Sequence, residues 1–198
     1  APYAQGFGDD GVLAPSSGDQ ASGEQGTPIF PPKPVEPPQP RLLASFVAES
    51  AQLSIANLTI VGRLTLHNTS NGPLRALTVR TTMISASDGQ REIIQQFHDD
   101  TGIGHAEVIG DVRAGEEISL ALEIQQPRFE MNEFDWRERR FLAPIVLINL
   151  NGRGPQGLET CKLSCLIGRD ATAETQRMKP FHTDRGPQRF EGLALHLV

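Results

Sequence analysis

The side chains between residues 98 and 107 form the densest set of potential metal ligands in the sequence. They are two histidines and three carboxylic acids: His98, Asp99, Asp100, His105 and Glu107. Glycines at positions 102 and 104 indicate a loop, where binding residues are often found. The spacing matches neither an EF-hand loop nor paired histidines on a helix. We therefore interpret the segment as a solvated acidic turn, expect no cofactor, and keep a metal-binding or metal-dependent protein as the alternative function.

The two cysteines, Cys161 and Cys165, are four residues apart in a segment that alternates apolar and polar side chains. On a strand they would share one face at a separation of about 13 Å, because each residue adds roughly 3.3 Å. That separation is too large for a disulfide, which needs Cα atoms within about 7 Å, or for one shared metal ion. Both cysteines are predicted to be small core side chains.

Sequence motifs with a known catalytic mechanism do not occur in this chain. It has no Gly-x-Ser-x-Gly nucleophile elbow, no glycine-rich phosphate loop before a lysine, and no His-Glu-x-x-His sequence. We therefore predict that the protein is not an enzyme and assign no catalytic residue.

A candidate surface for binding another protein lies in residues 129–140, which contain the only tryptophan beside three arginines. The candidate residues are Trp136, Arg137, Arg139 and Arg140. Tryptophan and arginine are enriched at the hot spots of protein interfaces, and arginine stacks on aromatic rings. The alternative is a connecting segment whose aromatic side chain closes one end of the fold while the arginines pair with neighbouring acids.

Strands must position these side chains, because apolar and polar residues alternate along most of the chain after residue 41. In residues 118–124, isoleucine and leucine occupy the even positions, with Ser119 and Glu123 between them. A period of two predicts a half-buried strand. The same pattern predicts strands at 42–53, 60–68, 77–83 and 159–167. The almost entirely apolar segment 141–150 is predicted to be a central strand covered on both faces, since Pro144 would disrupt a helix.

The predicted fold class is an all-β, immunoglobulin-like β-sandwich of about seven strands that spans residues 41–198. Two short helices are expected, at residues 90–97 and 131–139. The turn at residues 71–73 predicts a hairpin or an inter-sheet corner between two strands. The C-terminal tail is expected to cover a sheet edge, which is a common use of such a segment.

Residues 1–40 have a different composition and are predicted to be a disordered linker. They contain nine of the 15 prolines and six of the 19 glycines, with glycine and serine first and a proline-rich run after them. Such a segment buries too little apolar surface to offset the entropy of ordering, and the prolines stiffen it towards polyproline II. A spacer is the favoured interpretation, and a ligand for SH3-like domains is the alternative.

The charge distribution argues against nucleic acid as a partner. The net charge is −6, and residues 1–40 carry −4 of it, which leaves 19 acids and 17 bases in the rest of the chain. Binding to phosphates requires clustered lysine and arginine. No apolar stretch approaches the roughly 20 residues of a membrane-spanning helix, so a membrane contact is expected only through a segment absent from this chain.

The order of several segments resembles an uncharacterised proteobacterial family with an N-terminal membrane anchor, an arginine-rich stop, a proline-rich linker and a C-terminal immunoglobulin-like domain. The segments are the proline-rich run followed by residues 64–69, 77–80, 115–116, 141–150 and 178–181. The resemblance implies an anchor before residue 1 and an association with the inner membrane. By the positive-inside tendency it places the domain in the cytoplasm, with the periplasm as the alternative. It implies no activity.

Together these observations predict a non-catalytic protein-interaction or scaffolding module that is tethered near a membrane and binds another protein. They leave the identity of that protein open.

Overall fold

The computed structural model describes residues 41–99, 102–170 and 178–198, and shows an all-β domain with one α-helix. The predicted linker at residues 1–40 lies outside this part. The elements are β1 (Leu42–Leu53), β2 (Asn57–Asn68), β3 (Leu74–Ser85), α1 (Gln90–Asp99), β4 (His105–Val112), β5 (Glu117–Pro127), the 3-10 helix η1 (Arg128–Glu130), β6 (Phe134–Trp136), β7 (Arg139–Leu142), β8 (Pro144–Gly154), β9 (Gly157–Arg169), β10 (Phe181–His182), β11 (Gln188–Phe190) and β12 (Leu193–Leu197).

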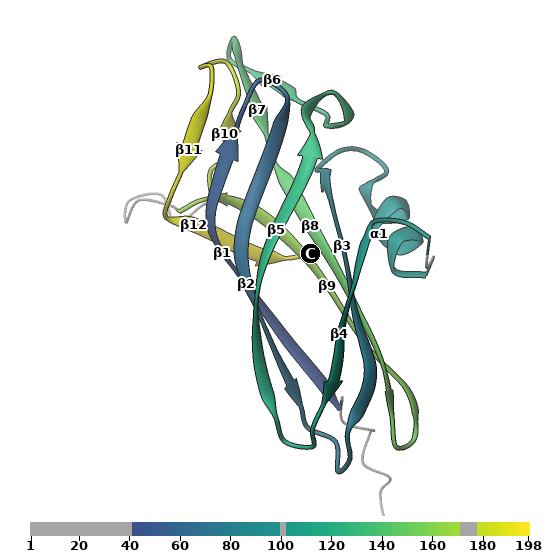
Figure 1. The fold of residues 1–198 in the computed structure, drawn as a ribbon. Coiled ribbons are helices and arrows are strands. Elements are labelled where there is room, and N and C mark those ends of the chain that lie inside the picture. The colour runs from purple at the N-terminus through teal and green to yellow at the C-terminus, as the bar shows by residue number, and fades with distance from the viewer. Residues whose placement is uncertain (1–40, 100–101, 171–177) are drawn as a thin grey trace, which may run out of the picture. The chain divides into compact units, whose positions relative to one another are not determined.

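Two antiparallel sheets form a β-sandwich (Figure 1). One sheet has the strand order β11-β1-β2-β5, and the other has the order β12-β9-β8-β3-β4. Seven strands have eight or more residues, and the first, second and fifth of these lie in one sheet while the others lie in the second. This division is that of an immunoglobulin-like sandwich, and it confirms the predicted fold class. A third, small sheet has the order β10-β7-β6.

The core forms where the apolar faces of the two sheets meet. Leu64 and Leu66 of β2 are fully buried, as is Ile148 of β8, and all three belong to one continuous hydrophobic cluster. The connection from β2 to β3 crosses from one sheet to the other, so the turn at residues 71–73 is an inter-sheet corner. The alternation that predicted the strands is therefore the alternation between core and solvent.

Strand β8 is covered on both faces, as the sequence predicted. Its residues from Pro144 to Leu150 are all buried, because α1 packs over the outer face of the sheet. Phe97 of α1 forms a second apolar cluster with Ile145 and Leu147. The predicted helix at residues 90–97 is thus confirmed, and it extends to Asp99.

The predicted helix at residues 131–139 is wrong. Residues 134–142 form a hairpin instead, in which Phe134 pairs with Phe141 and Trp136 with Arg139. Phe134 and Trp136 lie two positions apart, which is the period of a strand, and aromatic residues suit strands. The segment 141–150 is also divided, because the chain leaves the small sheet after Leu142 and enters the large sheet at Pro144.

The C-terminal tail covers sheet edges, as expected. Strand β11 pairs with β1, and β12 pairs with β9, at an edge of each large sheet. Cys161 and Cys165 are both free thiols on β9, and both pack against the core. Burial raises the pKa of Cys165 to about 11, so this thiol is protonated at neutral pH.

None of the helices in the described residues is both long enough and apolar enough to span a membrane.

Candidate functional site

The β6–β7 hairpin forms one wall of a groove at the end of the domain where β10 also lies (Figure 1). We call it the hairpin groove; it has a volume of about 880 Å³. The opposite wall comes from the end of β9 and from residues 178–180. The described lining residues combine aromatic, aliphatic and cationic side chains, and none of them carries a carboxylate.

The register of the hairpin decides which side chains face the groove. Because paired residues share a face, Phe134 and Phe141 lie on the same side as Trp136 and Arg139. The ring centroids of Phe134 and Phe141 are 5.8 Å apart, and those of Trp136 and Phe141 are 6.1 Å apart. Phe141 is buried, whereas Trp136 is 58% exposed and Phe134 42% exposed. Two exposed aromatic side chains therefore pack against one buried aromatic ring.

The turn of the hairpin is strained. Arg137 and Glu138 have φ angles of 50° and 62°, as a two-residue hairpin turn requires, but glycine and asparagine are the residues that adopt them readily. The turn places the Arg137 guanidinium 4.6 Å from the centroid of the Trp136 ring. Backbone strain of this kind is often found at functional sites, and here it holds an arginine over an exposed tryptophan.

Replacing Glu138 with glycine (Glu138→Gly) is expected to stabilise the domain by about 1 kcal/mol, because glycine removes the left-handed strain at this position. For a domain of this size the melting temperature should rise by about 2–4 °C, measured by thermal unfolding. The control is Glu123→Gly in the exposed face of β5, which should destabilise by about 0.5–1 kcal/mol. A melting temperature of Glu138→Gly at or below the wild-type value would contradict the claim that the backbone at Glu138 is strained.

Arg169 and Lys179 bring positive charge to the opposite wall. Their backbones form an antiparallel bridge, with N···O distances of 2.8 and 3.1 Å. Gly168 permits this approach, because a Cβ atom there would overlap Met178 and lie 2.7 Å from the Lys179 carbonyl oxygen. A glycine is thus needed where the segment that carries Lys179 crosses β9.

Two buried nitrogen atoms at the hairpin groove lack a hydrogen-bond partner in the described part of the chain. They are Arg169 Nε and His182 Nδ1. Burial lowers the pKa of His182, and the charge of Arg169 lowers it further, against the opposing effect of Asp184. His182 is therefore neutral at pH 7, and its ring lies 4.6 Å from the Phe141 ring. A buried polar atom without a partner is unfavourable, and binding of a complementary group would relieve this.

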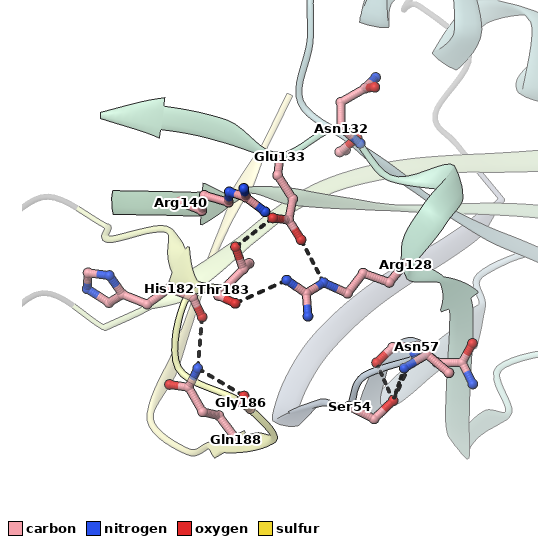
Figure 2. Close-up of polar contacts among 12 residues, drawn as sticks. Ser54, Asn57, Arg128, Asn132, Glu133, Arg140, His182, Thr183, Gly186 and Gln188 are labelled. Atoms are coloured by element: carbon pink, nitrogen blue, oxygen red, sulfur yellow. Dashed lines mark hydrogen bonds and ion pairs between the residues drawn. The ribbon is translucent and has the colours of Figure 1, made fainter. Parts of the chain in front are cut away.

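A network next to the hairpin groove joins η1 and the residue before β6 to the residue after β10 (Figure 2). Glu133 accepts hydrogen bonds from Arg128 Nε at 2.6 Å and from Thr183 Oγ1 at 2.8 Å, and Arg128 also donates to the Thr183 carbonyl oxygen. Burial alone would raise the pKa of Glu133, but the bonds from Arg128 and Thr183 outweigh it and lower the pKa. Figure 2 shows the His182 ring pointing away from this network, in which Glu133 is bound to Arg128 and Thr183.

Three of the four predicted interaction residues line the hairpin groove: Trp136, Arg137 and Arg139. Arg140 does not, because it pairs with Asp135 on the other face of the hairpin, where their charged groups are 3.8 Å apart. Sequence reasoning missed the cations of the second wall, Arg169 and Lys179. They follow the hairpin by about 30 to 40 residues, and no local pattern connects them to it.

The predicted ligand loop is dispersed in the structure. His98 Nε2 lies 2.9 Å from Ser164 Oγ, and Asp99 forms an ion pair with Lys162 at 3.0 Å. His105 and Glu107 are exposed at the start of β4. Asp100 lies outside the described residues, and within them no group of three or more histidine, cysteine, aspartate or glutamate side chains is arranged to hold a metal ion.

The contact between His98 and Ser164 has the pairing of a base and a nucleophile but lacks the rest of such a site. Nδ1 of His98 is buried and has no partner in the part of the chain that is described, so no acid orients the ring. Ser164 is only 8% exposed. Burial lowers the pKa of His98, and the charges of Lys162 and Arg80 lower it further, despite the opposing effect of Asp99. The pair is best described as a neutral hydrogen bond that attaches α1 to β9.

Comparison of the chain with protein-family models, with curated proteins and with solved structures finds no match.

Proposed function

We propose that this domain is a non-catalytic module that binds another protein through the hairpin groove. The observation that carries the proposal is the joint presence of exposed aromatic rings, four cationic side chains and two buried nitrogen atoms without partners in one concave surface. Aromatic and arginine side chains that converge in a pocket are typical of interface hot spots. Ligand sites are concave and mostly apolar with a few polar groups, and the hairpin groove has this composition.

The chemistry of the lining supports binding rather than catalysis. Among the described residues, the lining contains no serine, cysteine, aspartate or glutamate, and hence no hydroxyl or thiol nucleophile and no carboxylate base. His182 is the one histidine among the described lining residues, and burial and the charge of Arg169 lower its pKa against the opposing effect of Asp184. A general base needs a partner that orients it, and Nδ1 of His182 has none in the described residues.

The proposal includes a tether near the inner membrane. Its support is the resemblance to membrane-anchored proteins and the proline-rich composition of residues 1–40, which suits a semi-rigid spacer. We propose the cytoplasmic face on the same basis, with the periplasmic face as the alternative. The tether would raise the effective concentration of the domain for partners at that membrane.

Photo-crosslinking in cells tests the proposal. The full-length gene product is expressed with p-benzoylphenylalanine in place of Trp136 and, as a matched control, in place of Leu158. Leu158 is 70% exposed and lies just after the β8–β9 turn, away from the hairpin groove. A discrete crosslinked protein should appear in the membrane fraction with the probe at position 136 and be absent with the probe at position 158. The same products at both positions, or none at either, would overturn the proposed function.

A further inference from the structure

We infer that the hairpin groove recognises an acidic peptide segment that carries a bulky apolar side chain among its carboxylates. This inference rests on the proposed function and names the chemistry of the partner.

The positive charge of the lining indicates a negatively charged partner. Arg137, Arg139, Arg169 and Lys179 all line the hairpin groove, and no lining residue within the described ranges is acidic. Two carboxylates near the groove are engaged elsewhere, since Glu133 binds Arg128 and Thr183, while Asp135 lies on the opposite face of the hairpin. Asp184 acts on His182, but it is not among the lining residues. Like charges held together repel one another, and a negative ligand relieves that repulsion.

The unpaired hydrogen-bond donor of Arg169 indicates that the negative group of the partner is a carboxylate. Arg169 Nε is a buried donor without a partner in the described residues, and leaving such a donor unpaired costs about 1–3 kcal/mol. The planar guanidinium fork matches the geometry of a carboxylate, and a charge-assisted hydrogen bond is stronger than a neutral one. A partner carboxylate near Arg169 would remove this cost and gain the stronger bond.

The exposed aromatic surface of the groove calls for an apolar side chain in the partner peptide, between its carboxylates. Trp136 and Phe134 are exposed beside the buried Phe141, and Met178 and Pro180 provide apolar surface on the other wall. A small inorganic anion would leave all of this surface in contact with water. A side chain such as phenylalanine or leucine would cover it, at about 25 cal/mol for each Å² buried.

The position of the hairpin groove favours a peptide over a lipid surface. Strand β6 is the terminal strand of its sheet, and extended peptides commonly pair with such strands. Strand β1 begins at the end of the domain opposite to the hairpin (Figure 1). A tether that enters there leaves the hairpin groove at the far end of the domain, where it faces away from the point of attachment.

A peptide selection tests the inference without assuming a sequence. A displayed library of random dodecapeptides is selected on the full chain and counter-selected on Arg139→Gln. Recovered peptides should be enriched in aspartate and glutamate around an aromatic or branched aliphatic residue. Enrichment of neutral or basic peptides, or recovery of none, would overturn the inference. The crosslinking experiment would still decide the proposed function, so failure of one is distinguishable from failure of the other.

The recovered peptides are then titrated while the fluorescence of Trp136, the only tryptophan, is recorded. Arg139→Gln should weaken binding about fivefold or more, whereas the matched control Arg140→Gln, on the opposite face, should change it less than twofold. Equal losses in the two variants would count against the groove. Tighter binding to phosphatidylglycerol vesicles than to any peptide, with the same dependence on Arg139, would replace the peptide with a lipid surface and overturn the inference.

Discussion

Replacing Gly62 with alanine (Gly62→Ala) is expected to lower the free energy of unfolding by about 3 kcal/mol, measured by urea denaturation. Gly62 lies in β2 opposite Ala48, at the point where the β1–β2 register shifts. A Cβ atom at this position would be 2.5 Å from Phe46 Cζ and 2.5 Å from the Val47 carbonyl oxygen. Phe46 is a buried core residue, and the Val47 carbonyl belongs to the backbone of β1, so neither can move without loss of packing or pairing.

The matched control for Gly62 is another strand glycine with more room. In Gly152→Ala of β8, the new Cβ atom would be 3.1 Å from Leu77 Cδ1, the end of a flexible side chain, and farther from any backbone atom. We expect a loss below about 1 kcal/mol there. Equal losses in the two variants would show that the cost reflects glycine in a strand in general and not the close approach at the bulge.

Replacing Arg80 with methionine (Arg80→Met) is expected to destabilise the domain by about 3 kcal/mol. The Arg80 side chain is almost fully buried, with its guanidinium donating to the carbonyl oxygens of Phe97 and Ile103 at 2.7 and 3.2 Å. It also lies 4.8 Å from the centroid of the Phe97 ring. Methionine fills similar space but donates nothing, so two carbonyl groups lose a donor, at about 1–3 kcal/mol each where they are buried.

Arg80→Met should also loosen α1 before the sandwich unfolds. Hydrogen exchange should increase first in residues 90–99, because Arg80 binds a carbonyl in the last turn of this helix. Arg75→Met, at an exposed position of the same strand, should stay within about 0.5 kcal/mol of wild type. Unchanged exchange in α1 alongside a large loss of stability would show that Arg80 acts on the sheet rather than on the helix.

The sandwich could be predicted from the sequence because its signal is local. In residues 118–124 each side chain points to the core or to water according to its parity, and the structure repeats that alternation. The apolar segment after Pro144 likewise predicted a strand covered on both faces, although the sequence did not show that α1 provides the outer cover.

The wrong helix prediction falls in a segment where amino-acid composition and hydrophobic periodicity indicate different structures. Residues 131–139 are rich in charged side chains that suit a helix, but the alternation of Phe134 and Trp136 has the period of a strand. Cross-strand pairing of those rings with Phe141 and Arg139 determined the outcome. Such pairing is a tertiary effect, and it outweighs helix propensities of a few tenths of a kcal/mol.

Only the hairpin half of the candidate site could be predicted from the sequence. Trp136 and its neighbouring arginines are adjacent in the sequence, but the wall that carries Arg169 and Lys179 depends on a backbone bridge between these two residues, which are ten positions apart. That bridge needs Gly168, whose role becomes visible only when the two segments lie side by side. For the same reason the sequence did not indicate the contact between His98 and Ser164, which are 66 positions apart.

The start of β1 and the hairpin lie at opposite ends of the domain, and this placement has a mechanical consequence (Figure 1). If the chain is held at residue 41 while a bound partner pulls on the hairpin, the tension runs along the length of β1. The hydrogen bonds between β1 and β2 are perpendicular to that direction, so they are loaded in shear and resist together. Rupture would then require many of them to break at once instead of opening one after another, which makes this arrangement suited to carrying force.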